Sequence, residues 1–282
     1  YQPLLSMSPF GRYVVGHCRY LVMAGSSVVG EKEKVVISAT DVGGTWLNDD
    51  DPNDAVNMTL GSRVPSGSQV IKGLGRFRDK LMVMFEDAVL PGTLGEFVST
   101  DHVPDFGDAI ENVGAISHRI IQTVGEDMLF GDVNGVSSVS RDLFTGSVTS
   151  DSQSSLIEPE FHRAIERVNS TIALEDKVWS LWDSSANNYM LFIPDSAVNS
   201  QITEYRCMVY KKNKKLKIDA WQDWRNWKFV CGCRSALKRI FLGRGTEIYL
   251  MGESSAIDND IYLDAMGSEE MFDDDTTFTD QH

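Results

Sequence analysis

The sequence lacks the short motifs that mark the common catalytic and phosphate-binding sites. It contains no Gly-x-Ser-x-Gly nucleophile turn, no Gly-Lys-Ser/Thr phosphate loop, no His-Glu-x-x-His zinc motif and no EF-hand calcium loop. Its five histidines are scattered. His118, in GAISHRIIQ at the start of an expected strand, is interpreted as a hydrogen-bonded structural histidine and not as a base. No motif therefore indicates a catalytic centre or a cofactor.

Long apolar runs are also absent. No run of about 18 apolar residues is available for a membrane helix. The opening residues, YQPLLSMSPFGRY, lack the basic-then-apolar order of a secretory signal. We therefore predict a soluble protein without a membrane span. Because the sequence does not begin with methionine and stops within the acidic stretch EEMFDDDTTFTDQH, we expect it to be a segment of a longer polypeptide.

Cysteine is scarce, and the four cysteines are too unevenly spaced for a disulfide framework in a chain of 282 residues. This fits assembly inside a reducing compartment. Cys231 and Cys233 would point to the same face of a strand, but no histidine stands beside them to complete a metal site. We therefore favour small buried apolar residues over a metal site and predict no bound metal.

Basic residues are outnumbered, with 26 Lys and Arg against 41 Asp and Glu and a formal charge of -15. Such a charge repels phosphate and argues against general binding of nucleic acids. An acidic wall would nevertheless suit a channel through which DNA slides without sticking, because each Lys or Arg contact with phosphate adds affinity. Solubility alone is the other explanation, and net charge does not decide between them.

What the chain has in plenty is short runs rich in Val, Ile, Tyr, Phe and Trp, separated by clusters of Gly, Asp, Asn and Ser. This pattern predicts a mostly β fold. Two hairpins are expected, one with a polar tip from Asp183 to Asn188 and one that turns through Gly243-Arg244-Gly245. One helix is expected within SSLIEPEFHRAIERVNSTIALEDKV. The predicted strands are RYVVGH, RYLVMAG, KVVISAT, KLMVMFED, RIIQTVG, DMLFGD, VWSLWD, NYMLFIPD, EYRCMVYK, KLKIDAWQ, WKFVCGC, RIFLG and EIYLMG.

The spacing of the strongest strands predicts the architecture. Runs of an apolar strand followed by a Gly or Asp turn recur roughly 45 to 60 residues apart, which is in the range of propeller blades with inserted loops. The fold predicted from this spacing is a β-propeller over residues 1–252, followed by an acidic loop over 253–282 that leads to a continuation. A pair of β-sandwiches is the alternative. The recurring runs lie near Leu21, Leu81, Met128, Tyr189 and Ile240.

A partial Asp box, the hairpin turn repeated in the propellers of sialidases, occurs in SATDVGGTWL. In such a turn the aspartate accepts backbone N–H groups, glycine permits the tight bend and the aromatic ring packs underneath. Ala39 replaces the usual Ser or Thr, no second copy occurs, and the arginines show no spacing that picks out a sialidase triad. We interpret this turn as architecture and not as a catalytic element. Its residues are Asp41, Gly43, Thr45 and Trp46.

Three further features have both a functional and a structural interpretation. The acidic loop LNDDDPNDA could hold Ca²⁺ and the acidic tail IDNDIYLDAMGSEEMFDDD could bind a cation, although solvated and mutually repelling loops are favoured. Asp132-Val-Asn134-Gly135 is interpreted as a hairpin turn, because Asn-Gly favours positive φ angles. Trp221, Trp224 and Trp227 could stack on sugars or bases, but packing within the fold is favoured.

In order along the chain, five segments resemble one family. They are RYLVMAG with VVISATDVGGTWLNDDDP, GLGRFRDKLMVMFEDAVLPGTLG, HRIIQTVGEDMLFGDVNGVSSVSR, YRCMVYKKNKKLKIDAWQDWRNWKFVCGC, and RIFLGRGTEIYLMG. Each motif is weak by itself, and the order carries the resemblance from about Arg19 to Gly252. The family is the β-propeller tail nozzle, or tail-tube hub, proteins of short-tailed bacteriophages.

The resemblance implies a structural virion protein that is not an enzyme and has no cofactor. It implies a propeller of about six blades and a homo-oligomeric ring, a hexamer, in the virion tail after assembly in the host cytoplasm. The ring would form the distal channel for DNA ejection, contact an adaptor ring and tail fibre proteins, and pass double-stranded DNA without specific binding. A sialidase-like glycan-binding or glycan-cleaving propeller is the alternative. The lumen or rim candidates are Asp49, Asp50, Asp51, Asp54, Asp273, Asp274 and Asp275.

Overall fold

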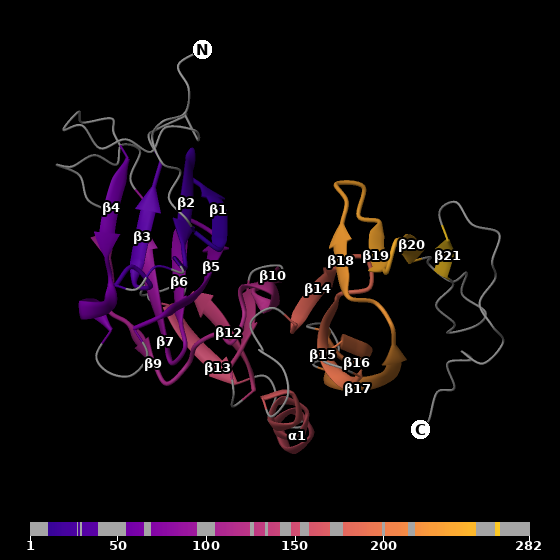
Figure 1. Ribbon diagram of the computed structural model, residues 1–282. Helices are drawn as coiled ribbons and strands as arrows, with labels where there is room; N and C mark the ends of the chain where they lie inside the picture. The colour runs from indigo at the N-terminus through magenta and orange to yellow at the C-terminus, as the bar shows by residue number, and fades with distance from the viewer. Residues whose placement is uncertain are drawn as a thin grey trace, which may run out of the picture. The chain divides into compact units, whose positions relative to one another are not determined.

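The computed structural model divides the chain into two compact units, Tyr1–Val178 and Trp179–His282. Figure 1 colours the first from indigo to magenta and the second from orange to yellow. Nearly all described elements are strands, and the predicted helix is present as α1 (Glu158–Asn169). The described residues are 11–26, 28, 30–38, 55–64, 69–94, 105–124, 127–132, 135–141, 148–152, 158–169, 177–198, 201–213, 218–251 and 263–265.

The first unit contains three antiparallel sheets, which we call A, B and C, each built from strands that are consecutive along the chain. In sheet B, β9 also pairs with β7. Sheet A consists of β1 (Tyr13–His17), β2 (Tyr20–Ala24), β3 (Lys34–Ile37) and β4 (Val56–Thr59). Sheet B consists of β5 (Ile71–Phe77), β6 (Lys80–Phe85), β7 (Ala88–Thr93), β8 (Asp105–Phe106) and β9 (Ile110–Glu111). Sheet C consists of β10 (Gln122–Val124), β11 (Asp127–Gly131), β12 (Val136–Arg141) and β13 (Val148–Ser152).

The second unit repeats this organisation in two antiparallel sheets, D and E, again with strands paired in chain order. Two short 3₁₀ turns, η1 (Gly61–Arg63) and η2 (His118–Ile120), belong to the first unit. Sheet D consists of β14 (Trp179–Asp183), β15 (Asn188–Val198), β16 (Gln201–Asn213) and β17 (Ile218–Trp227). Sheet E consists of β18 (Cys231–Arg234), β19 (Ile240–Arg244), β20 (Glu247–Met251) and β21 (Leu263–Ala265).

Strand β6 explains how the three sheets of the first unit stack. Leu81, Val83 and Phe85 belong to a core shared with sheet A, whereas Met82 and Met84 belong to a core shared with sheet C. Successive side chains of a strand point to opposite faces, so sheet B is covered on both sides. A doubly covered strand needs an uninterrupted apolar run, and KLMVMF supplies it.

Strand β15 has the same character in the second unit. Met190 and Phe192 lie in a core shared with sheet E, and the intervening Tyr189, Leu191 and Ile193 are also fully buried. Strand β15 is therefore buried on both faces, as β6 is. A strand that is covered on both faces requires an uninterrupted apolar run, and YMLFI supplies it.

The prediction of a mostly β fold is confirmed, as are the helix and the predicted hairpins. Strand β14 ends at Asp183 and β15 begins at Asn188. The hairpin of β19 and β20 turns at Gly245 (φ +58°), whereas Gly243 and Arg244, which were predicted in the turn, belong to β19. The amide of Asp132 donates to the carbonyl of Gly135 (2.9 Å), and the Gly135 amide donates to Asp132 Oδ1 (2.9 Å), which closes the predicted hairpin turn between β11 and β12.

Two predicted strands were placed wrongly. RIIQTVG was expected to be a strand from its first residue, but His118–Ile120 forms η2 because Ser117 Oγ accepts from the Arg119 amide (3.2 Å) and caps the turn. WKFVCGC was expected to be one strand, but β17 ends at Trp227 and β18 begins at Cys231. Strand β21 lies inside the segment predicted as an acidic loop and pairs with β20; the domain boundary at residue 252 stays a prediction.

Candidate functional site

The site residues predicted from sequence lie outside the described residues. This applies to the four residues of the partial Asp box and to the seven aspartates of the acidic loops, whose roles as a structural turn and as lumen or rim candidates stay predictions. The residues concerned are Asp41, Gly43, Thr45, Trp46, Asp49, Asp50, Asp51, Asp54, Asp273, Asp274 and Asp275.

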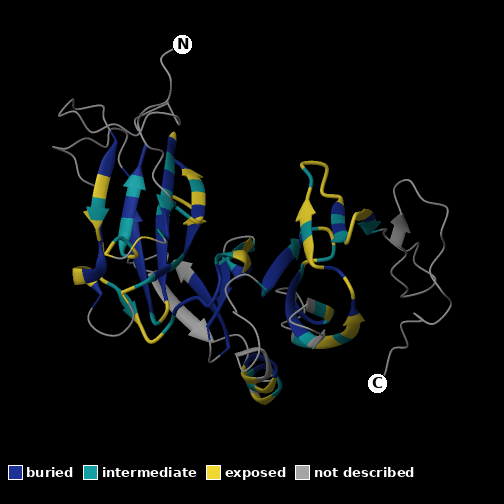
Figure 2. Ribbon diagram, viewed as in Figure 1, coloured by how far each residue is buried: buried dark blue, intermediate teal, exposed yellow. Residues whose placement is uncertain are grey.

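Sheet E has one covered and one uncovered face. Leu242 and Tyr249 point into the core shared with sheet D, and the alternate residues point away. On the face that points away, the register pairs Cys231 with Gly243 and Gly243 with Ile248 in one row across the three strands. In the next row it pairs Cys233 with Phe241 and Phe241 with Leu250. Ile248 is 56% exposed, and β18 is largely exposed in Figure 2. We call this surface, formed by Cys231, Cys233, Phe241, Ile248 and Leu250, the outer face of sheet E.

The prediction that Cys231 and Cys233 are buried is therefore wrong, and the buried cysteine is Cys207, for which the sequence made no prediction. Cys207 is buried in sheet D, and burial raises the pKa of its thiol. Cys231 and Cys233 are exposed, because β18 is an edge strand and both thiols lie on the uncovered side. Sequence alternation correctly put the two thiols on one face but could not tell which face is buried.

Sheet A has a matching uncovered face. Val22 and Ile37 point into the core shared with sheet B, while register aligns Val14, Met23 and Val36 across three strands on the other side. Val14 is 47% exposed, and the others are half-buried. We call the surface of Val14, Leu21, Met23 and Val36 the outer face of sheet A. Sheets A and E are thus the first and last in chain order, and on the outer face of each one large apolar side chain is exposed, Val14 and Ile248 respectively, beside half-buried apolar ones.

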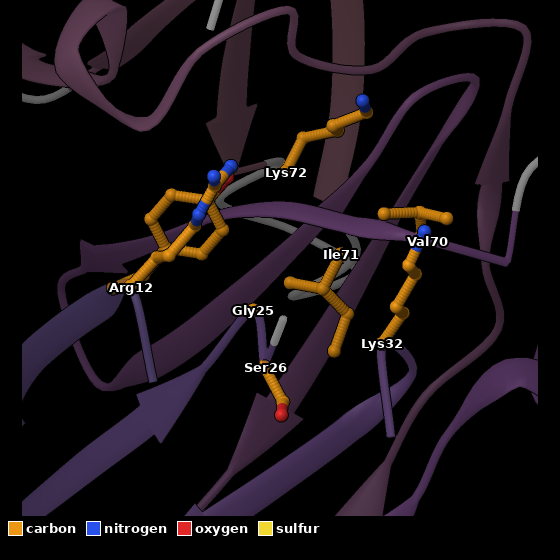
Figure 3. Close-up of a pocket in the computed structure, with 8 residues that line it drawn as sticks. Arg12, Gly25, Ser26, Lys32, Val70, Ile71 and Lys72 are labelled. Atoms are coloured by element: carbon orange, nitrogen blue, oxygen red, sulfur yellow. The ribbon is translucent and has the colours of Figure 1, made fainter. Parts of the chain in front are cut away.

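A polar pocket of about 260 Å³ lies between the edges of sheets A and B. Arg12, Lys32 and Lys72 approach it from three different segments, as Figure 3 shows. The apolar part of the lining includes Tyr13, whose ring lies so close to Gly25 that a Cβ there would sit 2.4 Å from it. The lining contains no carboxylate. The pocket could attract a small anion, but it does not supply the paired carboxylates that glycoside hydrolysis requires.

An ion pair between the buried Arg206 and the partly exposed Asp223 joins β16 and β17 on the face of sheet D that points away from sheet E. Arg206 Nε donates to Asp223 Oδ1 (2.6 Å) and a terminal nitrogen donates to Oδ2 (2.7 Å), a bidentate arrangement. The Arg206 side chain is 6% exposed and that of Asp223 is 33% exposed; Arg225 adds a second contact at 3.2 Å. Burial alone would raise the pKa of Asp223, but the hydrogen bonds and charges of Arg206 and Arg225 outweigh it and lower the pKa.

The lowered pKa of Asp223 predicts acid sensitivity. Its folded-state pKa lies below the unfolded value of about 3.9, so its stabilisation is complete above that pH and is lost as pH falls through the folded-state pKa. Asp223→Asn should be less stable by about 1 to 2 kcal/mol at pH 7, because Arg206 loses its anionic partner. Its stability should also fall less steeply than the wild type in acid.

Urea unfolding at several pH values between 3 and 7 measures both effects, with Asp105→Asn, an exposed carboxylate of β8, as the control. Parallel stability curves for wild type and Asp223→Asn would contradict the assignment.

The interpretation of His118 as a structural histidine is confirmed, although it lies in η2 and not at the start of a strand. Its Nδ1 accepts a hydrogen bond from the Leu74 amide (3.2 Å), and burial lowers its pKa. Gly73 makes this approach possible, since a Cβ there would lie 3.1 Å from the Cα of His118. Within the described ranges, no group of three or more His, Cys, Asp or Glu residues is placed to hold a metal ion.

The prediction that the tryptophans pack within the fold is confirmed for Trp224 and Trp227. Trp227 is buried against Phe192 (5.5 Å between centroids, edge-to-face), and Trp224 stacks on Trp227 at 5.8 Å. An extra residue in β17 between these two, where Asn226 adopts φ +63°, puts both rings on one face. Trp221 packs against Tyr210 at 4.9 Å and is half-buried.

Comparisons with known proteins identify no family for this chain. No protein-family model matches the chain, and no curated protein is significantly similar to it. One similar solved structure is that of a protein of Bacteroides fragilis NCTC 9343 that is named only as exported; it shares 8% identity and a TM-score of 0.29, over 84% of this chain and 79% of that one. Such a score carries no functional argument. Within the part of the chain that the structure describes, no helix has both the length and the apolar character needed to cross a membrane.

Proposed function

We propose that the chain is a structural β-propeller protein that assembles into a ring, and that the ring forms the distal channel of a short-tailed bacteriophage tail. The observation that carries the proposal is the succession of antiparallel sheets, each formed by strands that follow one another in sequence. Four of the five sheets have four strands. A propeller blade is a four-stranded antiparallel sheet of this kind.

Sheet stacking supports the same proposal. Blades of a propeller pack face to face around an axis, so each blade must be apolar on both faces. Strand β6 of sheet B and strand β15 of sheet D are buried on both faces, as this requires. The outer faces of sheets A and E are apolar although solvent reaches them, which fits sheets that are to be covered on assembly.

The channel role rests on the resemblance and on charge. The order of motifs from Arg19 to Gly252 resembles the tail nozzle family, and the formal charge of -15 suits a channel that passes DNA without retaining it. A hexameric ring, about six blades, contacts with an adaptor ring and tail fibre proteins, and a place in the virion tail all belong to this proposal.

Negative-stain imaging of the purified chain, with a fluorogenic sialoside turnover assay on the same sample, tests the proposal. We expect rings with an axial hole and no turnover. Monomers that cleave the sialoside would overturn it in favour of a glycosidase. Monomers without turnover would also contradict it, since the proposal needs the chain to form a ring.

A further inference from the structure

We infer that the pocket between the edges of sheets A and B binds a phosphate group, either free or at the end of a small phosphomonoester. The inference concerns a single chain and does not need the proposed ring. Cationic side chains from three segments line the pocket, and none of the eight residues that line it is acidic. The cations are Arg12, Lys32 and Lys72, which Figure 3 shows as sticks.

Backbone hydrogen bonds bring the three cationic segments together. The Arg12 amide donates to the Gly25 carbonyl (3.3 Å), which joins the segment before β1 to the end of β2. The Ile71 amide donates to the Lys32 carbonyl (3.1 Å), which joins the start of β5 to the segment before β3. Lys72 follows Ile71 directly along β5. The fold therefore sets the backbone positions of the cations before a ligand arrives, which reduces the cost of ordering them on binding.

The acidic residues of the segment before β3 have other contacts and do not line the pocket. Glu31 accepts hydrogen bonds from the ammonium group of Lys34 (3.0 Å) and from Ser26 Oγ (3.3 Å), and the contact with Lys34 lowers its pKa. The carboxylate of Glu33 lies against Gly61. The lining thus supplies three positive charges and no negative one, and a partly enclosed group of like charges attracts an anion.

The number and placement of the cations favour phosphate over a carboxylate. A carboxylate has two oxygens in one plane, and a single arginine can bind both of them. A phosphate group carries close to two negative charges at neutral pH and has three acceptor oxygens that point in different directions. Arg12 can bind it as a planar fork, while Lys32 and Lys72 act as point charges from two other segments. All three cations therefore find a partner on one phosphate group.

The size of the pocket limits the rest of the ligand. Its volume of about 260 Å³ lies below the roughly 300 to 1,000 Å³ of sites for drug-sized ligands. Part of the lining is rigid, because Gly25 adopts φ +75° and the buried ring of Tyr13 packs directly against it. Val70 and Ile71 add apolar surface. A free phosphate ion or a short phosphomonoester suits this space, whereas a nucleotide with its sugar and base needs more room.

Calorimetric titration of the full chain with inorganic phosphate, and separately with glycerol 3-phosphate, tests the inference. We expect one saturable site per chain. Tighter binding of glycerol 3-phosphate would identify an ester as the ligand, and tighter or equal binding of inorganic phosphate would identify the free ion. Sulfate, also a tetrahedral dianion, should compete, and acetate should not. Acetate that binds as tightly as phosphate, or no saturable binding of either probe at about 10 mM, would overturn the inference. Binding of a short DNA duplex but of neither probe would overturn it too.

Single substitutions locate the bound phosphate. Lys32→Gln and Lys72→Gln should each weaken binding about tenfold, since each removes one charge-assisted contact. Lys80→Gln is the matched control: it makes the same charge change in β6 of the same unit, where Lys80 donates to Thr93 Oγ1 (2.8 Å) and does not line the pocket. Its affinity should stay within about twofold of the wild type, because a distant charge is screened.

The exposed position of Lys32 keeps this test independent of folding. Urea unfolding of Lys32→Gln should match that of the wild type, so that lost affinity reports lost binding. If Lys72→Gln does not fold, Lys32→Gln decides the result. Equal phosphate affinity of Lys32→Gln, Lys80→Gln and the wild type would place the anion outside the pocket and overturn the inference.

Discussion

Replacing Gly114 by alanine should lower the free energy of unfolding by about 3 kcal/mol, because the added methyl group has no space. A Cβ at this position would lie 2.1 Å from the carbonyl oxygen of Glu86 and 2.6 Å from that of Phe85. Both are backbone atoms at the turn between β6 and β7, and the amide of Ala115 is bonded to the same Phe85 carbonyl (2.9 Å). No rotamer change can relieve the clash, so the backbone must move.

Gly16→Ala is the matched control for this substitution. Gly16 lies in β1, and no atom stands within 4 Å of the position its Cβ would take. Its effect should be smaller than about 1 kcal/mol, since only the intrinsic strand preference changes. Urea unfolding of both variants measures the difference. Equal stability of Gly114→Ala and Gly16→Ala would show that the turn between β6 and β7 is not packed as described.

Trp179→Ala should destabilise the second unit by about 3 to 5 kcal/mol, the usual cost of emptying a large buried aromatic site. Trp179 stacks on Phe192, with 3.8 Å between ring centroids and 5° between planes. Its ring also crosses Gly232 of β18, where a Cβ would lie 3.0 Å from it. One side chain thus joins sheets D and E, and its loss should disorder their shared core.

Hydrogen exchange should report this loss as reduced protection of amides in β14, β15 and β18. Trp182→Ala is the control on the same strand, because Trp182 points to the opposite face and is half-buried. We expect less than about half the destabilisation of Trp179→Ala from this control, in proportion to the area it buries. Unchanged protection in Trp179→Ala would contradict the assigned core of the second unit.

Strands were predictable from sequence where both faces are buried. The runs that became β6 and β15 are apolar without interruption, and any arrangement that buries a sheet on both sides requires such runs. Strands β4 and β13 were missed because they lie at the edges of their sheets and lack an apolar run: β4 alternates apolar and polar residues, and β13 is mostly polar. Strand β7 was missed because Pro91 within it argues against a strand.

The surfaces that carry the proposals could not be predicted in the same way. Alternation along β18 shows that Cys231 and Cys233 share a face, but only the register with β19 and β20 adds Phe241 and Ile248 to that face. The pocket likewise needs the fold, since Arg12, Lys32 and Lys72 are far apart in sequence and no motif links them. Pairwise contacts between strands are long-range information that a local pattern does not contain.

The solution mass of the purified chain tests the central claim, that uncovered sheet faces assemble this protein into a ring. Sedimentation equilibrium at several concentrations gives that mass without cross-linking or adsorption to a surface. Our account predicts a discrete multiple of the mass of one chain, six for the proposed hexamer, with no larger species because a closed ring leaves no face free. A single-chain mass at every concentration would contradict it.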